Sequence, residues 1–331
     1  MKICIRTPSD FRFRSAVCSH GFFALAPNRW HPPTRTLHTV VGLDASAAVG
    51  VAIREGPGRV IVIESGDELP APRRAAVGRA VRRILRVDED LSAFHRRCRA
   101  SPGHARAASI GFGRLLRSAS LFEDIVKVIC TCNTTWRQTT AMVRGLVAWG
   151  TPAEQSGGNQ DGPARAFPTP QQLAGVRETA LKKRARVGYR SAFIRRLARD
   201  VADGRLDLGE LESFDGPSDE LYQRLKHIRG IGDYGAANLC MLLGRYDRLA
   251  VDSEMLRLFR QRHPERAWTP ADLRAYYECW RPFQFLAYWF DLWQDYVERH
   301  GQADQWWPNT TGQAITNPRP AAGAARIRQG P

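Results

Sequence analysis

The first third of the chain carries short apolar runs that are typical of strands. Residues 36–65 contain LHTVVGLD, VGVAIRE and RVIVIESG, in which β-branched residues dominate and Gly or Pro breaks each run. β-Branched side chains favour a pleated backbone, and the breaks supply turns. We therefore expect these residues to form strands of a small antiparallel sheet.

From Ala71 onward the apolar residues take up helical spacing. Segments such as RRAAVGRAVRRILRV, SLFEDIVKVICTC and FQFLAYWFDLWQDYVERHG repeat apolar positions every three or four residues, and several segments begin after Ser, Thr or Asp. This spacing buries one helix face, and those residue types cap helix N-termini. A stretch rich in Gly, Pro and polar residues predicts a loop at 151–170.

The two patterns together predict an α+β fold that is mostly α. We expect a small N-terminal antiparallel β-sheet domain with flanking helices over residues 1–110, followed by a helical body over residues 111–302. Residues 303–331 are rich in Pro, Gly, Ala and Arg. This composition cannot bury a core, so it predicts a disordered tail.

The basic charge of the chain indicates nucleic acid as a partner. The formal net charge is +16, and only five of the 49 basic residues are Lys. Arginine binds phosphate in a bidentate manner, and phosphate contacts dominate affinity for nucleic acid. The alternative is a solvated basic surface. No apolar run has the length of a membrane span, and the first residues lack the apolar core of a signal peptide.

The cysteines indicate neither a zinc site nor a disulfide framework. Seven cysteines are scattered along the chain with no CxxC pair. Free cysteines of this kind are typical of a reducing compartment. We therefore expect a cytoplasmic protein, and nothing in the pattern predicts a metal site or an oligomer.

Residues 225–244, LKHIRGIGDYGAANLCMLLG, contain the strongest motif. Ile228 closes one predicted helix, Gly230 and Gly232 form a tight turn, and Tyr234 lies at the start of a second helix. Glycine allows positive φ and close approach, and amides at a helix N-terminus face a phosphate. The pattern predicts a helix-hairpin-helix that clamps DNA regardless of sequence. The alternative is an ordinary corner between two helices.

The chain after this hairpin resembles a known superfamily. Asp252 lies in LAVDSE, eighteen residues after Tyr234. With this spacing the chain resembles the helix-hairpin-helix–Gly/Pro/Asp (HhH-GPD) DNA glycosylases, in which a loop containing Gly and Pro follows the hairpin and precedes a catalytic Asp. The loop here keeps Gly244 but has no Pro, so it departs from the full signature.

Further segments extend the resemblance to roughly residues 10–300. The segment LFEDIVKVICTCN, which ends at Asn133, and the FP and GYR patterns at 167–168 and 188–190 resemble 8-oxoguanine DNA glycosylase. SHGFFALAPNRW near the start resembles bacterial glycosylases of the 3-methyladenine DNA glycosylase II type. The resemblance implies that the partner is damaged double-stranded DNA and that the protein acts as a monomer.

The resemblance assigns the chemistry to Asp252. Cleavage of a purine N-glycosidic bond builds positive charge on the sugar, as in glycoside hydrolysis. A fixed carboxylate stabilises that charge and orients or deprotonates a water molecule. The alternative is that Asp252 only caps the helix SEMLRLFR, and the two roles are compatible. Asp247 and Glu254 are rival carboxylates that do not occupy the matching position.

Tyr234 bears on the reaction type. In bifunctional members of the superfamily the matching residue is a Lys that forms a Schiff base with the sugar. A phenol cannot do so, and no Lys follows Lys226. The resemblance therefore implies a monofunctional glycosylase that hydrolytically releases an alkylated or oxidised purine. Cys279 is the single cysteine after Asp252, which excludes the four-cysteine iron–sulfur cluster of some members. The resemblance also implies a monovalent cation bound to the carbonyl oxygens of the hairpin. It implies no organic cofactor.

A base reached in duplex DNA must leave the stack, and a side chain must fill the gap. Asn133 matches the wedge residue of the superfamily; its alternative role is to cap the helix that follows. We expect the base pocket to include the residues Trp136, Tyr189, Asn238, Gln284 and Tyr288, although aromatic residues at helical spacing usually belong to the core. Two other functions stay open: a damaged-DNA-binding protein without turnover, and an 8-oxoguanine-type glycosylase/lyase.

Overall fold

The predicted strands form the centre of a five-stranded antiparallel sheet with the order β1-β5-β4-β3-β2. The computed structural model describes residues 1–44, 46–153 and 164–306. The strands are β1 (Lys2–Arg6), β2 (Arg29–His31), β3 (Thr36–Gly42), β4 (Ala48–Gly56) and β5 (Val60–Glu64). The predicted antiparallel sheet is confirmed. The two edge strands, β1 and β2, were not predicted because neither carries a long β-branched run.

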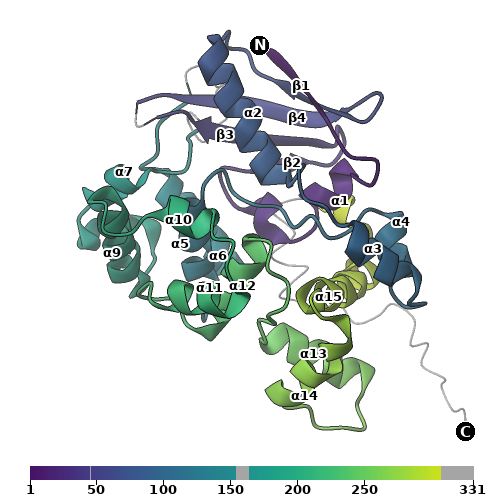
Figure 1. Ribbon diagram of the computed structural model, residues 1–331. Helices are drawn as coiled ribbons and strands as arrows, with labels where there is room; N and C mark the ends of the chain where they lie inside the picture. Colours follow the sequence, from purple (N-terminus) through teal and green to yellow (C-terminus); the bar gives the residue numbers. More distant parts are fainter. Residues whose placement is uncertain (45, 154–163, 307–331) are drawn as a thin grey trace, which may run out of the picture.

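Helix α2 (Ala71–Leu85) lies across one face of this sheet (Figure 1). It buries Val77, Val81 and Ile84, which follow one another at helical spacing and therefore share one face. Apolar residues of the sheet and of α2 belong to the same hydrophobic cluster. The helix thus covers the inner side of the sheet, as the change of periodicity near Ala71 predicts.

The rest of the chain is helical, which confirms the mostly-α fold class. Its elements are α1 (Phe13–Val17), η1 (Gly21–Ala24), α3 (Ser92–Arg99), α4 (Ala105–Ser109), α5 (Leu121–Thr131), α6 (Trp136–Val147), α7 (Pro170–Ala174), α8 (Glu178–Ala180), the π-helical turn η2 (Leu181–Ala185), α9 (Arg190–Ala202), α10 (Leu208–Glu212), α11 (Ser218–Lys226), α12 (Asp233–Leu242), α13 (Ser253–Arg262), α14 (Pro270–Tyr276), η3 (Glu278–Trp280), α15 (Gln284–His300) and η4 (Ala303–Gln305). In Figure 1 the sheet lies at one end and α13 and α14 at the other.

One hydrophobic core spans the predicted domain boundary at residue 110. The ring of Phe112 lies 5.0 Å from that of Phe290 and 5.5 Å from that of Trp293, both on α15. The same cluster of buried residues includes Trp30 of β2 and Phe13 of α1. The sheet and the helical body are therefore packed directly against each other, and the N-terminal residues can contribute to a site in the body.

The start of the predicted tail is ordered, which corrects the expectation of disorder from residue 303. Residues Ala303–Gln305 form η4 because Asp304 is held twice: its carbonyl accepts from Trp30 Nε1 at 2.8 Å, and its carboxylate pairs with Arg14 at 2.9 Å. Residues 307–331 lie outside the described part of the chain. So do residues 154–163 of the predicted loop, whose described ends meet in a bridge between Pro152 and Arg165.

Buried charge fixes the start of α5. Asp124 is fully buried and pairs with Arg83 at 2.9 Å and Arg117 at 3.2 Å, while its second oxygen accepts from the amide of Ser118 at 2.8 Å. Although burial opposes ionisation, the two guanidinium groups lower the pKa of Asp124 to about 2. Because α5 leads into the turn at Asn133, this cluster helps to position the candidate site.

Candidate active site

The predicted hairpin is present between α11 and α12, and its two glycines have different roles. Gly230 has a φ of +96°, and a Cβ at this position would lie 2.7 Å from the ring of Phe193. Gly232 has an extended backbone with a φ of −95°, and a Cβ there would meet nothing within 4 Å. Glycine is thus needed for the fold at Gly230. The open space in front of Gly232 leaves room for another chain to approach. Ile228 and Ile231 are buried and anchor the turn.

The N-terminus of α12 is free to bind an anion. Its N-cap is Gly232, and no side chain caps the helix. Within the described residues, the carbonyl groups of residues 229–231 accept no backbone hydrogen bond from the first turn, so the amides of that turn stay unpaired. Unpaired amides and the helix dipole favour a phosphate at this position. This arrangement is what the predicted DNA clamp requires.

Asp252 lies at the start of α13 and caps that helix. Its Oδ1 accepts from the amide of Met255 at 2.9 Å and, more weakly, from the hydroxyl of Tyr288 at 3.5 Å. The predicted cap is therefore present, and it is compatible with either role of Asp252. The cap holds the carboxylate in place but does not remove it from the cavity, because Asp252 also lines a cavity beside the hairpin. Burial raises the pKa of Asp252 above its usual value of 3.8, and the nearby Glu254 acts in the same direction.

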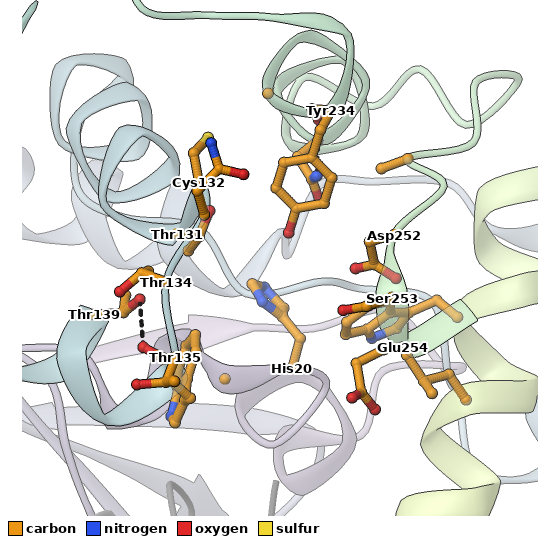
Figure 2. A pocket seen from close by; sticks show the side chains of 18 of the residues that line it. His20, Thr131, Cys132, Thr134, Thr135, Thr139, Tyr234, Asp252, Ser253 and Glu254 are labelled. Atoms are coloured by element: carbon orange, nitrogen blue, oxygen red, sulfur yellow. Dashed lines mark hydrogen bonds between the residues drawn. The ribbon is translucent and has the colours of Figure 1, made fainter. Parts of the chain in front are cut away.

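The cavity has a volume of about 1070 Å³ and lies between α5, α6, α12, α13, α15 and η1. Figure 2 shows Tyr234, Asp252 and His20 on different walls, with their side chains directed into the same space. Nine of the predicted site residues line this cavity, namely Asn133, Trp136, Tyr189, Gly230, Gly232, Tyr234, Asn238, Asp252 and Tyr288. The tertiary structure therefore brings together residues that are as far apart as 133 and 288 in the sequence.

Tyr234 is a half-buried phenol in this cavity. Burial raises its pKa, and the negative charge of Asp252 raises it further, so the hydroxyl stays protonated at neutral pH. Asn238, one turn later on α12, donates from Nδ2 to the carbonyl oxygen of Tyr234 at 2.9 Å. Tyr234 therefore brings a neutral phenol, and no amine, to the wall of the cavity.

Asn133 lies in the exposed turn between α5 and α6 with a φ of +49°. The guanidinium of Arg190 holds this turn by donating to the carbonyl oxygens of Cys132 and, at 3.1 Å, Asn133. Thr135 caps α6, not Asn133, so the alternative of a capping role for Asn133 is wrong. The side chain of Asn133 is exposed at the mouth of the cavity and has no hydrogen bond to another described residue.

Tyr189 lies at the same mouth and is 55% exposed, which is unusual for a large aromatic side chain. The guanidinium of Arg190 lies 4.6 Å from the centre of its ring, and the ring meets Phe193 edge-on at 6.0 Å. Because Phe193 also packs on Gly230, Tyr189 and the hairpin turn belong to one continuous surface.

Two predicted residues do not line this cavity. Ile228 supports the hairpin from below, as a packing residue. Gln284 is only 3% exposed and lies in a separate crevice behind the loop 247–251, where its Nε2 donates to Glu278 at 3.4 Å. The structure therefore does not place Gln284 with the base-pocket residues; α15 presents Tyr288, one turn later, to the cavity instead.

Several residues that line the cavity were not among the predicted site residues, chiefly His20 and Trp289. His20 precedes η1 in the segment SHGFF, whose resemblance to glycosylases was the available signal. Glu254 also lines the cavity, but its carboxylate is held by the hydroxyl of Tyr296 at 2.7 Å and by Nε of Arg257 at 2.9 Å. Among the described residues Asp252 thus has no cationic partner, whereas Glu254 is paired with Arg257.

The described residues contain no group of three or more His, Cys, Asp or Glu side chains that could hold a metal ion. No helix in the described part of the chain is long and apolar enough to cross a membrane. All the cysteines are free thiols.

Comparisons with known proteins identify the fold. No protein-family model and no curated protein sequence matches the chain. The 3-methyladenine DNA glycosylase of Archaeoglobus fulgidus is 18% identical with a TM-score of 0.70, and the match covers 88% of this chain and 98% of that one. The 8-oxoguanine glycosylase/lyase of Clostridium acetobutylicum in its apo form is 17% identical with a TM-score of 0.68 over 88% and 96%. Bound to double-stranded DNA containing cytosine opposite 8-oxoguanine, the same enzyme is 16% identical with a TM-score of 0.69 over 91% and 96%. The chain has the fold of these DNA glycosylases, which confirms the predicted fold.

Proposed function

We propose that this protein is a monofunctional DNA glycosylase of base-excision repair. It flips a damaged purine, alkylated or oxidised, out of double-stranded DNA and hydrolyses the N-glycosidic bond, leaving an abasic site. The observation that carries the proposal is the position of Asp252. Its fixed carboxylate, which has no cationic partner among the described residues, lies on the wall of a cavity large enough for a base, next to the uncapped N-terminus of α12.

The chemistry follows from this placement. A phosphate gripped by the amides of α12 holds the DNA backbone beside the cavity, so the flipped sugar lies close to Asp252. As the bond to the base breaks, the carboxylate stabilises the positive charge on the sugar and orients the attacking water. The Met255 amide keeps the carboxylate in place throughout, so little reorganisation is needed.

The absence of lyase chemistry rests on Tyr234. The residue facing Asp252 is a protonated phenol, and no lysine lines the cavity within the described residues. A Schiff base requires an amine that attacks the sugar. We therefore expect water to be the nucleophile. Trapping with borohydride separates the two mechanisms, because it captures a protein–DNA adduct only in a lyase.

The cavity walls suit a purine. The aromatic side chains of Trp136, Tyr288 and Trp289 line it, and a flipped base stacks on such surfaces. At its mouth Asn133 would fill the gap in the duplex, with Tyr189 beside it. The carbonyl oxygens of residues 229–231, which accept no hydrogen bond from described residues, fit a monovalent cation that would stiffen the hairpin.

The deciding experiment is release of a free base from duplexes that carry methylated or oxidised purines, followed by mass spectrometry. We expect a free purine and an intact strand containing an abasic site. DNA binding without release would instead support a binding protein. Strand cleavage with a trapped adduct would support a glycosylase/lyase and contradict the interpretation of Tyr234.

A further inference from the structure

The floor of the cavity is formed by the turn at His20, which comes from the N-terminal part of the chain. Figure 2 shows the His20 ring in the space between Tyr234 and Asp252. The imidazole lies 4.6 Å from the ring of Phe22 and meets Trp289 edge-on at 6.2 Å. A polar ring beside the aromatic walls of the cavity is a candidate for contact with the base.

The hydrogen bonding of His20 fixes which of its nitrogens carries the proton. Nε2 lies 2.6 Å from the carbonyl oxygen of Leu116, and a carbonyl oxygen can only accept. Nε2 therefore carries the hydrogen, and Nδ1 of the neutral ring keeps its lone pair. No described residue donates a hydrogen bond to Nδ1. Burial lowers the pKa of His20 to about 4, so the ring is neutral at physiological pH.

The backbone that carries His20 is held rigidly. Trp289 Nε1 donates to the carbonyl oxygen of Ser19 at 2.8 Å, and the amide of Leu116 donates to the hydroxyl of Ser19 at 2.9 Å. On the other side, a Cβ on Gly21 would lie 2.4 Å from the indole of Trp136, so the turn packs tightly on α6. These backbone contacts, together with the hydrogen bond from Nε2 to Leu116, hold the ring in one orientation with Nδ1 as its acceptor.

We propose that Nδ1 of His20 reads the flipped base as a fixed hydrogen-bond acceptor and selects bases that present an N–H to the cavity floor. This inference rests on the proposed function, since it assumes that the cavity takes a base. A base that presents a carbonyl oxygen or a substituted nitrogen to Nδ1 forms no hydrogen bond with it. Both groups are then left without a hydrogen-bond donor, which is unfavourable in a buried site. The N–H can come from an exocyclic amine or from a ring nitrogen.

The test uses free bases, so it does not depend on turnover or on DNA binding. Quenching of the tryptophans that line the cavity reports binding of 3-methyladenine, which offers an exocyclic amine, of its N6,N6-dimethyl derivative, which offers no N–H, and of hypoxanthine, which offers ring N–H groups. We expect wild-type protein to bind at least one N–H base about tenfold to a hundredfold more tightly than the dimethyl derivative.

Variants locate the preference at His20. His20→Phe keeps a ring but removes the acceptor, and we expect it to bind all three bases equally. The matched control is His38→Phe on β3, outside the cavity, which should keep the wild-type preference. His20→Gln, whose side-chain oxygen can still accept, should retain part of it. If His20→Phe loses the preference for 3-methyladenine over the dimethyl derivative, the exocyclic amine is the group that His20 recognises. If it loses the preference for hypoxanthine over the dimethyl derivative, His20 recognises the ring N–H.

Three results would overturn the inference: no preference in the wild-type protein, a preference that survives in His20→Phe, or no binding of any base. The comparison of bases on the unmodified protein stands even if a variant fails to fold. If binding depends on His20 but no base is released from damaged duplexes, the proposed function fails while the recognition by His20 stands. If bases are released equally well by wild type and by His20→Phe, the recognition by His20 fails while the proposed function stands.

Discussion

Replacing Asp252 by Asn tests the central claim, because the change removes the charge but keeps the shape. An asparagine oxygen can still accept from the amide of Met255, which Asp252 does at 2.9 Å. Asn and Asp are about equally good N-caps, so we expect the helix α13 to stay intact. The free energy of unfolding should change by less than about 1 kcal/mol.

The expected loss of activity follows from electrostatics. A carboxylate about 4 Å from a developing sugar cation contributes about 4 kcal/mol at an effective dielectric constant of 20. Loss of this interaction in the transition state corresponds to about a thousandfold slower base release. Binding to undamaged duplex depends on the hairpin instead, so the dissociation constant of the variant should equal that of the wild type.

The assay is single-turnover base release, accompanied by fluorescence anisotropy with duplex DNA and by thermal unfolding. Asp247→Asn is the matched control, since Asp247 lies in the crevice behind the 247–251 loop and not in the cavity. It should release base at the wild-type rate. Wild-type release by Asp252→Asn, or an equal loss in both variants, would refute the assignment.

Acid pH gives an independent check on the same residue. Burial raises the pKa of Asp252, and the ionised form is the active one. As the pH is lowered, the rate of base release should therefore begin to fall at a higher pH than it would with an aspartate of ordinary pKa. The sign for stability is opposite to that of a paired carboxylate. Because the pKa of Asp252 is higher in the folded than in the unfolded protein, the free energy of unfolding falls as the pH rises through this pKa. Asp252→Asn carries no such buried charge, so it should be at least as stable as wild type at neutral pH.

Three further predictions concern the hairpin, the reaction type and the fold. Gly232→Val should fold normally, since a side chain there meets open space, but it should weaken binding to all duplexes alike. Gly230→Val should instead lower the melting temperature, because its side chain would collide with Phe193. An effect of Gly232→Val that is confined to one lesion would contradict the role of the hairpin as a DNA clamp. Borohydride should trap no adduct with wild-type protein, because Tyr234 supplies no amine; Tyr234→Phe should remain untrapped as well. Asp124→Asn should reduce the free energy of unfolding by about 1.5–3 kcal/mol in urea titrations, since it removes the charged partner that Arg83 and Arg117 share and leaves Glu212 as their remaining carboxylate partner among the described residues. In wild type this contribution is present above pH 3.8 and disappears as the pH falls through about 2, so an Asp124→Asn loss that is equal at all pH values would argue against the ion pair.

The sequence was most informative where local rules act. The change from β-branched runs to helical spacing near Ala71 predicted the sheet and the helices that follow it. The glycines at 230 and 232 predicted the hairpin because a tight turn between helices is a local feature. The choice of Asp252 as the candidate carboxylate followed from its spacing after Tyr234, and the cap that holds it was also a local inference.

The edge strands β1 and β2 escaped prediction for a physical reason. Both are short, and β1 is held by pairing with a partner far along the chain, as in the register of Lys2 with Glu64. Strand pairing over that distance depends on the fold and not on local propensity. The order of residues 303–306 has the same origin, because Trp30 and Arg14 hold Asp304.

By itself the sequence determined most of the elements, the hairpin and the cap at Asp252, since these depend on residues that are neighbours in the chain. Only the tertiary structure decided what shares the cavity. Gln284 and Tyr288 lie one turn apart on the same face of α15, yet only Tyr288 reaches Asp252, because packing sets how far along its axis the helix extends past the cavity. His20 entered the site because α15 and α6 clamp its turn beneath Asp252, a placement that no local pattern of polar and apolar residues encodes.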